Sequence, residues 1–433
     1  MGSNWQTVKF SDVCDIWRGG SPRPIHEWIM PQGIPWVKIS DATAAGSRYI
    51  ERTKEFIRPE GRAKSREVVS GDLILSNSAT PGLPMLMAID ACIHDGWLLL
   101  RNFKGIDKLF CYYLLLYERP NLVRQGSGSV FTNLKTAILK NHVVRIPPVK
   151  EQQAIACILG ALDDKIELNR RMNETLGGMA QAIFKSWFVD FDLVRAKAAG
   201  QQLPGLASYI ADLFPDAFEA SELGKIPREW KYRSLYSCAQ YINGAAFRSS
   251  DFSPDWSGLP IIKIAELKKG ITAKTKFTSK ELKSKYLLNN GDILFSWSGS
   301  PKTSLDVFLW SGGPAWLNQH IFRVIPNRSI ERSFIYSLLR YLKPTFIEIA
   351  RNKQTTGLGH VTMRDMKDLQ VVLPPDEILG AFHRIAGPLL DRVYCNMVES
   401  HTLTQLRDTL LPKLISGELR VPDAERFLTE VSS

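Results

Sequence analysis

Two long stretches of the sequence repeat apolar residues at every seventh position, and this spacing constrains the fold more than any other feature. The first stretch follows Pro147-Pro148, and proline begins a helix more readily than it continues one. Its seventh-position residues are Ile155, Leu162, Asn169, Leu176 and Ile183. A heptad seam of this kind is typical of a long amphipathic helix that packs against a partner helix.

The partner helix is expected far downstream, after Pro374-Pro375. Its seventh-position residues are Phe382, Leu389, Asn396, Leu403 and Leu410, each 227 residues after its counterpart. The first helix leaves one half of the chain and the second helix leaves the other half, so we predict that the two pair antiparallel. A helix rises about 1.5 Å per residue, so helices of about 40 residues would span roughly 60 Å.

An asparagine occupies the same point of both heptad repeats, at Asn169 and Asn396. A polar residue in a heptad seam lowers the stability of the helix pair but fixes its register. Two interpretations stay open at this point. Either the two asparagines meet inside the pair, or they are incidental exposed polar residues.

The similarity between the two halves extends beyond the helices and indicates an internal repeat. Residues 33–39 (GIPWVKI) match residues 258–264 (GLPIIKI), and residues 71–76 (GDLILS) match residues 291–296 (GDILFS). Each of these segments is a turn followed by a short apolar run rich in β-branched residues, which predicts a strand.

Further matching elements complete each half. Apolar faces with charged flanks predict helices at residues 108–119 and 330–342. Short strands are predicted at residues 143–146 and 369–373, immediately before each Pro-Pro pair. Each half is therefore expected to be a mixed α/β domain of ordinary size with a long helix attached.

These elements together predict an α+β fold: two pseudo-repeated mixed α/β domains joined by two long antiparallel coiled-coil helices, with approximate two-fold symmetry. The predicted boundaries are 1–148 for the first domain, 149–191 for the central helix, 192–228 for a connector, 229–375 for the second domain, 376–420 for the distal helix and 421–433 for a tail. The connector is expected to be ordered, because Phe214, Phe218 and Leu223 are too apolar for a free linker.

The net charge of +11 is divided unevenly along the chain. Residues 1–148 hold 19 Lys and Arg against 13 Asp and Glu, and residues 222–375 hold 23 against 12. The helical segments are acidic, with 7 against 10 in residues 149–221 and 6 against 9 in residues 376–433. A polyanion should therefore meet the protein at two separate domains. The alternative is that the basic surfaces only aid solubility.

Composition places the chain among ordinary globular proteins, with 44% hydrophobic and 23% charged residues. The longest apolar run, residues 109–117, is too short to cross a bilayer, so no membrane association is expected. The six cysteines include no C-x-x-C pair and are expected to be reduced thiols of a cytoplasmic protein.

Nearly the whole chain resembles the specificity subunit of type I restriction–modification systems. The most specific motifs are IPPxxEQQxIAxILxxLDDKIELN at residues 146–169, AQAIFKSWFVDFD at 180–192, GKIPREW at 224–230 and TLLPKLISGEL at 409–419. The segment from Gly19 to Trp36 resembles the opening of a target-recognition domain, and Asn243 to Ser250 resembles a variant of that opening.

This resemblance implies that each domain is a target-recognition domain for one half of a bipartite double-stranded DNA sequence. It implies two modification (methyltransferase) subunits docked on the helices, and motor-nuclease restriction subunits added to them. The chain itself is then not an enzyme and holds no cofactor. S-adenosylmethionine, ATP and Mg²⁺ are expected in the partner subunits.

The motifs of the catalytic subunits are not found in the sequence. The Pro-Pro pairs lack the preceding Asp or Asn of a methyltransferase motif, and no Walker loop is present. One pattern favours an enzyme: Asp255, Glu266 and Lys268 fit a loose nuclease spacing in which carboxylates hold Mg²⁺. A Mg²⁺-dependent nuclease is therefore one alternative. A coiled-coil scaffold whose basic domains bind acidic proteins is another.

For DNA recognition we select polar residues in the glycine-rich turns of the two basic domains. Arginine can bind guanine through two hydrogen bonds, asparagine or glutamine can bind adenine, and lysine can bind phosphate. In the first domain the candidates are Arg18, Ser21, Arg23, Lys38, Asn77, Ser78, Ser127, Ser129 and Asn133. In the second domain they are Arg248, Ser249, Lys263, Trp297, Ser298, Lys302, Asn318, His320, Gln354 and His360.

Overall fold

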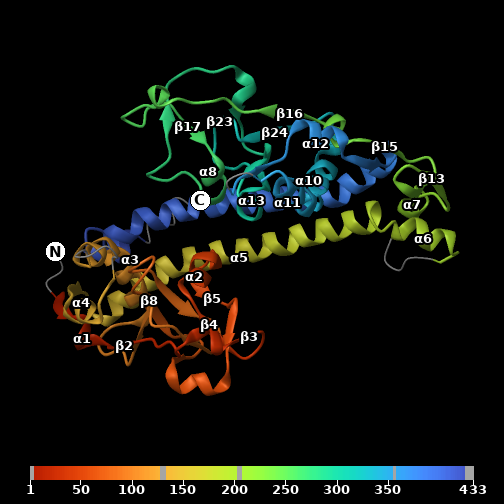
Figure 1. Cartoon of the computed structure of the whole chain (residues 1–433). Helices are drawn as coiled ribbons and strands as arrows, with labels where there is room; N and C mark the ends of the chain where they lie inside the picture. Colours follow the sequence, from red (N-terminus) through yellow and green to blue (C-terminus); the bar gives the residue numbers. More distant parts are fainter. Residues whose placement is uncertain (1–3, 127–132, 202–206, 355–356, 425–433) are drawn as a thin grey trace. The chain divides into compact units, whose positions relative to one another are not determined.

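A computed structural model of the chain describes residues 4–126, 133–201, 207–354 and 357–424 (Figure 1). The chain divides into two units, which are described separately below. The first unit comprises Met1–Leu168 and Thr402–Ser433, and the second comprises Asn169–His401. Each unit therefore contains one mixed α/β domain and a part of each long helix.

The two long helices begin where their proline pairs end. Helix α5 spans Val149–Phe188 and helix α13 spans Asp376–Ser416 (Figure 1). Helix α5 stops before the predicted end at residue 191, because the N–H groups of Val189 and Asp190 both turn back to the carbonyl of Lys185.

The heptad seam is the buried side of the helix pair in each unit. In the first unit, Ile155 and Leu159 of α5 share one apolar cluster with Leu410 and Leu414 of α13. In the second unit, the aromatic ring of Phe184 from α5 lies 6.2 Å from the ring of Phe382 from α13. The predicted α+β fold, with two long helices packed together, is confirmed.

The two seam asparagines meet in the second unit. Both are 0% exposed, so the interpretation as incidental exposed residues is wrong. The Asn169 amide donates to the backbone oxygen of Asn396 at 3.5 Å and to the hydroxyl of Ser400 at 3.3 Å, and Asn396 donates to Asn173 Oδ1 at 2.9 Å. Asn169 contacts Ser400, whereas Asn173, one turn later in α5, contacts Asn396, one turn earlier in α13. The two helix segments therefore run antiparallel.

Over its described residues, the first unit contains two five-stranded sheets and a two-stranded one. The first sheet has the order β2 (Asp15–Arg18), β11 (Trp97–Arg101), β8 (Leu73–Ser76), β9 (Pro84–Met87), β5 (Tyr49–Ile50). The second has the order β3 (Ile29–Met30), β6 (Glu55–Ile57), β4 (Ile34–Val37), β10 (Ala91–Ile93), β7 (Arg66–Val68). Strand β1 (Gln6–Lys9) pairs with β12 (Val143–Ile146), and the helices of the domain are α1 (Phe10–Val13), α2 (Ile39–Ala45), α3 (Lys108–Gln125) and α4 (Thr136–Asn141).

Alternation along β11 divides the core of the first unit into two layers. Leu98 and Leu100 face the cluster that holds α3 and the long helices, whereas Trp97 and Leu99 face a second cluster between the sheets. Successive side chains of a strand point to opposite faces of its sheet, so apolar residues at consecutive positions bury both faces of β11. The predicted strands at residues 71–76 and 143–146 and the predicted helix from residue 108 are all present.

The second unit has a similar two-sheet arrangement, with four strands in each of these sheets over its described residues where the first unit has five. One sheet has the order β16 (Ala239–Asn243), β24 (Ile321–Pro326), β20 (Ile293–Ser296), β22 (Asp306–Leu309). The other has the order β18 (Phe277–Thr278), β17 (Leu259–Ile262), β23 (Ala315–Leu317), β19 (Leu287–Leu288). Strand β15 (Lys231–Ser234) pairs with β26 (Gln370–Leu373), β21 (Ser298–Gly299) pairs with β25 (Gly359–His360), and the helices are α8 (Ile264–Lys269), α9 (Pro301–Ser304), α10 (Arg332–Tyr341), α11 (Lys343–Asn352) and α12 (Met363–Asp368).

The connector is folded onto the second unit over its described residues. It contains α6 (Asp192–Ala198), α7 (Ser208–Ala211) and a hairpin of β13 (Phe218–Ser221) and β14 (Gly224–Pro227). Phe214 is buried in the core of the second unit and Phe218 packs against that core, as the apolar composition suggested. Leu223 is exposed, because it lies in the turn of the hairpin. Most of the predicted tail lies outside the described residues.

Two further expectations can be compared with the structure. All six cysteines are free: Cys14, Cys92, Cys111 and Cys238 are buried, whereas Cys157 and Cys395 are exposed. Within the part of the chain that the structure describes, no helix combines the length and the apolar character needed to cross a membrane.

Candidate nucleic-acid interface

A cleft of about 440 Å³ in the first unit brings together several of the predicted DNA contacts. Ser21, Arg23, Lys38 and Ser78 all line it, although they come from three separate segments of the sequence. Arg23 is the most exposed of the charged residues, with 76% of its side chain accessible. The sequence therefore identified residues that share one surface of the folded domain.

The cleft depends on a close contact between the turn after β2 and the turn before β11. Gly19 N–H donates to the Trp97 carbonyl at 2.8 Å, and Gly20 N–H donates to the Ile93 carbonyl at 3.1 Å. A Cβ atom on Gly19 would lie 2.1 Å from the carbonyl oxygen of His94. Only glycine fits this approach, which explains the Gly-Gly-Ser-Pro opening of the domain.

Asp95, which sequence reasoning missed, is the polar centre of this surface. Its carboxylate accepts hydrogen bonds from Ser21 Oγ at 2.7 Å and from Arg23 Nη2 at 3.3 Å. Its backbone oxygen accepts from Arg18 Nε at 3.0 Å and from Asn77 Nδ2 at 2.9 Å. Four predicted residues therefore converge on one aspartate.

The charge of Asp95 is stabilised by these contacts. Partial burial by itself raises the pKa of a carboxylate. The hydrogen bond from Ser21 and the charges of His94, Arg23 and Arg18 outweigh it and hold the pKa of Asp95 below its ordinary value. Asp95 is therefore ionised at neutral pH, and its negative charge lies among the cations that are expected to meet DNA.

Two other predicted residues of the first domain have structural partners. Asn77 is buried, and its amide supports the turn at Asp95. Lys38 Nζ donates to Glu55 Oε1 at 2.6 Å and lies 5.2 Å from the centre of the Trp36 ring. Asn133 is exposed, whereas Ser127 and Ser129 lie outside the described residues.

In the second unit, the equivalent surface is built from Trp297 and His320. The indole Nε1 of Trp297 donates to Asn243 Oδ1 at 3.1 Å, and its ring centre lies 5.7 Å from that of His320. Next to Trp297, Ser298 pairs with His360 in the two-stranded sheet of β21 and β25. The structure thus brings together four of the predicted residues in the second domain.

The remaining predicted residues of the second domain lie on other elements. Asn318 is buried in the turn before β24. The exposed members are Arg248 and Ser249 near the 3-10 helix Ser249–Asp251, Lys263 before α8, Lys302 in α9 and Gln354 after α11. Lys263 Nζ lies 5.3 Å from the centre of the Phe252 ring, which supports its aliphatic stem.

The two surfaces share their backbone hydrogen bonds. Gly20 N–H donates to the Ile93 carbonyl, and Ala245 N–H donates to the Leu317 carbonyl in the same way at 2.9 Å. A Cβ atom on Gly244 would lie 2.1 Å from the Asn318 carbonyl oxygen, as one on Gly19 would from the His94 carbonyl. The scaffold is repeated, and the side chains on it differ.

The residues of the nuclease pattern serve local turns. Glu266 accepts hydrogen bonds from the Lys263 N–H at 3.1 Å and from Thr275 Oγ1 at 3.2 Å, and is 9% exposed. Asp255 accepts from Ser257 N–H at 3.2 Å, and its hydrogen bonds to Ser257 lower its pKa. Over the described ranges, the structure contains no group of three or more His, Cys, Asp or Glu side chains arranged to hold a metal ion. These contacts give the carboxylates a capping role at the ends of turns.

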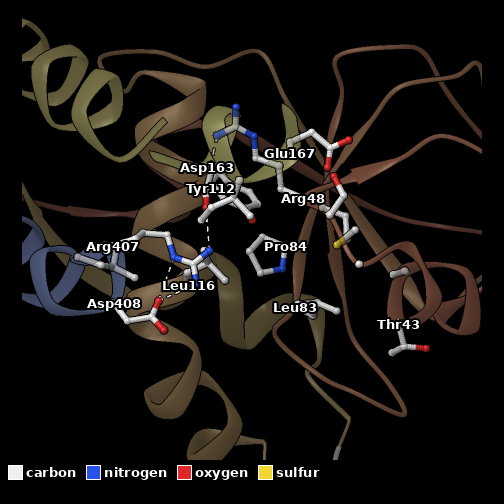
Figure 2. A pocket seen from close by; sticks show the side chains of 16 residues that line it. Thr43, Arg48, Leu83, Pro84, Tyr112, Leu116, Asp163, Glu167, Arg407 and Asp408 are labelled. Carbon is white, nitrogen blue, oxygen red and sulfur yellow. Dashed lines mark hydrogen bonds and ion pairs between the residues drawn. The ribbon is translucent and has the colours of Figure 1, made fainter. Parts of the chain in front are cut away.

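A second cleft of the first unit, also about 440 Å³, lies where the domain meets its segments of the two long helices (Figure 2). Figure 2 shows Arg48 of the domain and Arg407 of α13 on either side of Asp163 of α5. Arg407 Nη1 donates to Asp163 Oδ1 at 2.7 Å, and Tyr113 donates to Asp163 Oδ2 at 2.7 Å. Arg48 Nη1 lies 3.8 Å from Asp163 Oδ2, and Arg48 also pairs with Asp164.

The second unit has an equivalent cleft of about 570 Å³ with different chemistry. Strand β22, helix α10 and the two long helices line it, as β9, α3 and the long helices line the first. Leu390 and Ala180 occupy the positions of Asp163 and Arg407, offset by 227 residues. The ion pair of Asp163 and Arg407 in the first unit is thus replaced by two apolar residues in the second.

The fold and the two equivalent surfaces define a tandem-repeat α+β protein with one polar surface on each repeat. A model described as the type I restriction modification DNA specificity domain matches residues 2–177 and 227–393. The chain therefore belongs to this family, and the resemblance noted in its motifs to type I specificity subunits is confirmed.

Individual relatives agree with the family assignment. The chain is 26% identical over 430 residues to the specificity subunit of the type I restriction enzyme MjaIX of Methanocaldococcus jannaschii, covering 97% of this chain and 94% of the relative. It is 25% identical over 415 residues to the HindI specificity subunit of Haemophilus influenzae, covering 83% and 88%. The crystal structure of the type I S subunit from M. genitalium shares the fold, with a TM-score of 0.55, 16% identity and coverage of 95% and 96%.

Proposed function

We propose that the chain recognises DNA for a type I restriction–modification complex, with each domain recognising one half of a bipartite target. Both domains carry the excess of positive charge that favours binding of a polyanion. The first has 19 Lys and Arg against 13 Asp and Glu, and the second has 23 against 12. The side chains on the shared scaffold differ between the repeats, so the two half-sites should differ in sequence. The target is then asymmetric.

The observation that carries this proposal is the cleft of the first unit. Arg18, Ser21, Arg23 and Asn77 meet at Asp95, and Lys38 and Ser78 line the same cleft. Arginine, serine and lysine side chains on one exposed surface combine base contacts with phosphate contacts. The remaining predicted contacts, including Trp297, His320 and His360 in the second domain, belong to the proposal on the same grounds.

The catalytic steps are assigned to partner subunits. Two modification subunits would dock on the helix pair, and restriction motor-nuclease subunits would join them in the cytoplasm. S-adenosylmethionine, ATP and Mg²⁺ would be bound by those partners, and this chain would be non-catalytic. The capping roles of Asp255 and Glu266 support the non-catalytic assignment, because both carboxylates are used locally.

The helix pair would set the gap between the half-sites. The contacts of Asn396 with Asn169 and Asn173 support this role, because polar contacts inside a seam fix one register. Inserting one heptad after Asn169 and one after Asn396 preserves the seam. The insertion should lengthen the preferred gap by about two or three base pairs, since seven residues add about 10 Å.

The test is a footprint of the chain assembled with its modification subunits on a duplex selected from a random-sequence library. Two protected blocks separated by an unprotected gap are expected. One continuous block would overturn the proposal of two recognition domains. Affinity should also fall steeply with salt, and a salt-independent affinity would instead favour a scaffold for protein partners.

A further inference from the structure

We propose that Asp95 is a specificity-determining residue of the first domain, acting by holding Arg23 and Arg18 in place and opposing non-specific phosphate binding. This inference rests on the proposed DNA recognition and adds to it a residue that the sequence did not point to. Asp95 would act through the arginines, so it is a positioning residue.

The geometry around Asp95 restrains side chains that would otherwise be mobile. Arg23 and Arg18 are exposed, and free arginine side chains lose considerable rotamer entropy when they bind a base. Arg23 Nη2 lies 3.3 Å from Asp95 Oδ2, and Arg18 Nη2 lies 3.9 Å from the same oxygen. A guanidinium held in advance has less entropy to lose on forming two hydrogen bonds to guanine.

The aspartate is itself held firmly in position. Its carboxylate accepts from Ser21, its N–H donates to Ser21 Oγ at 3.3 Å, and its carbonyl is bound by the buried Asn77. The adjoining turn is tied to β2 through the close contact at Gly19. The carboxylate therefore has a fixed place relative to both arginines.

Charge gives Asp95 its second effect. Phosphates attract any nearby arginine in any sequence, and this attraction supplies non-specific binding. A carboxylate beside Arg18 and Arg23 offsets part of their attraction for phosphate. It leaves their N–H groups able to donate to a base whose position matches. The domain then has lower affinity for all DNA but a larger ratio of specific to non-specific affinity.

The second repeat provides a natural comparison. Gln319 occupies the position of Asp95 in the turn before the equivalent strand, and it is neutral and exposed. Its amide lies 3.4 Å from His320 Nε2. The second domain therefore lacks this negative charge at the turn, and it should show weaker discrimination at the bases that this surface contacts.

The experiment replaces Asp95→Asn in the chain assembled with its modification subunits. The probes are a duplex selected by the wild-type assembly and a duplex of the same composition with both half-sites scrambled. Asp95→Asn keeps an acceptor for Ser21 but removes the charge. We expect tighter binding to the scrambled duplex, a salt slope steeper by about 0.9, and a specificity ratio reduced about tenfold.

Asp90→Asn is the matched control. Asp90 is an exposed aspartate of the same unit that accepts a hydrogen bond from Ser70 N–H, and an asparagine can keep that bond. The Asp90→Asn substitution also removes one negative charge, but the described contacts of Asp90 do not include Arg18 or Arg23. Its specificity ratio should stay at the wild-type value.

Combining Asp95→Asn with Arg23→Gln completes a double-mutant cycle. If Asp95 acts through the arginines, its replacement should change the specificity ratio much less once Arg23 is gone. Equal losses of specific and scrambled binding in Asp95→Asn, or a ratio equal to that of Asp90→Asn, would overturn this inference. A wild-type assembly that selects no sequence from the library would instead overturn the proposed function itself.

Discussion

The two units differ in the side chains that lie at the junction between the domain and its segments of the long helices. In the first, the junction between the domain and its helix segments is an ionic cluster in which Asp163 lies between Arg48 and Arg407. In the second, Leu390 and Ala180 take the positions of Asp163 and Arg407 and are buried in an apolar cluster. The repeated backbone therefore tolerates either solution.

Aromatic residues of the second unit belong to the same apolar cluster as Leu390 and Ala180. Phe184, Phe188, Phe334 and Phe382 pack with ring centres 5.1 to 6.2 Å apart. Edge-to-face and tilted aromatic contacts stabilise beyond their buried area. The first unit lacks this concentration of rings among its described core residues and uses buried charges instead. A buried ion pair constrains the geometry of its partners, but the cost of desolvating the charges offsets much of its contribution to stability.

The largest expected effect concerns the aromatic junction. Phe382→Ala removes a fully buried ring and should lower the free energy of unfolding of the second unit by about 3–5 kcal/mol. Hydrogen exchange measured by mass spectrometry reports each unit separately and should show faster exchange in α10 and β26. Unchanged exchange in the second unit would show that the ring cluster does not hold that unit together.

The ionic junction should respond next most strongly. Asp163→Leu copies the second repeat but leaves Arg48 and Arg407 without their shared carboxylate, so the first unit should lose about 3 kcal/mol. The triple change Arg48→Met, Asp163→Leu and Arg407→Ala should recover most of this loss. A triple variant less stable than Asp163→Leu alone would show that the ion pairs contribute net stability. The stability of the first unit in both variants can be measured by hydrogen exchange.

The sequence predicted those features that depend on local periodicity. The heptads located α5 and α13, and the repeated Gly-Asp turns located β8 and β20. The asparagine at the same point of each heptad left two interpretations open, and the buried polar contact is the correct one. Each of these signals is a spacing between residues that are close together in the sequence, so it can be recognised without the structure.

The features that were missed depend on contacts between distant segments. Asp95 meets Ser21 across 74 positions, and Asp163 meets Arg407 across 244. No spacing rule connects such residues, because the folded sheet and the helix pairing bring them together. Leu223 contributed to the prediction of an ordered connector, although the hairpin turn exposes its side chain.

The two lysines at equivalent positions provide a third test of the comparison. Lys38 is neutralised by Glu55, whereas within the described residues Lys263 Nζ has no hydrogen-bond or ion-pair partner. Lys263→Ala should therefore lower the log–log salt slope for a scrambled duplex by about 0.9, and Lys38→Ala should lower it less. Fluorescence anisotropy titrations at several salt concentrations measure the slopes. Equal decreases would contradict the assignment of Lys263 as the stronger phosphate contact.

The smallest expected effect is a pH dependence confined to the first unit, which has His94 where the second has Asn318. Burial is the main cause that lowers the pKa of His94 below the ordinary 6.5, and Lys38 adds to the decrease against the opposing effect of Asp95. His94 Nδ1 also accepts a hydrogen bond from Gly96 N–H at 2.6 Å, which protonation at that nitrogen would remove.

The sign of the effect follows from linkage between protonation and folding. Because the pKa of His94 is lower in the folded chain, the unfolded chain binds this proton more readily. The contribution to stability is fully present above about pH 6.5 and is lost as the pH falls below that value. Hydrogen exchange at pH 7 and at lower pH, corrected for intrinsic rates, should show selective weakening of β11 and its turn. His94→Asn, which copies the second repeat, should reduce that selectivity, and a variant with an unchanged pH profile would exclude His94 as its source.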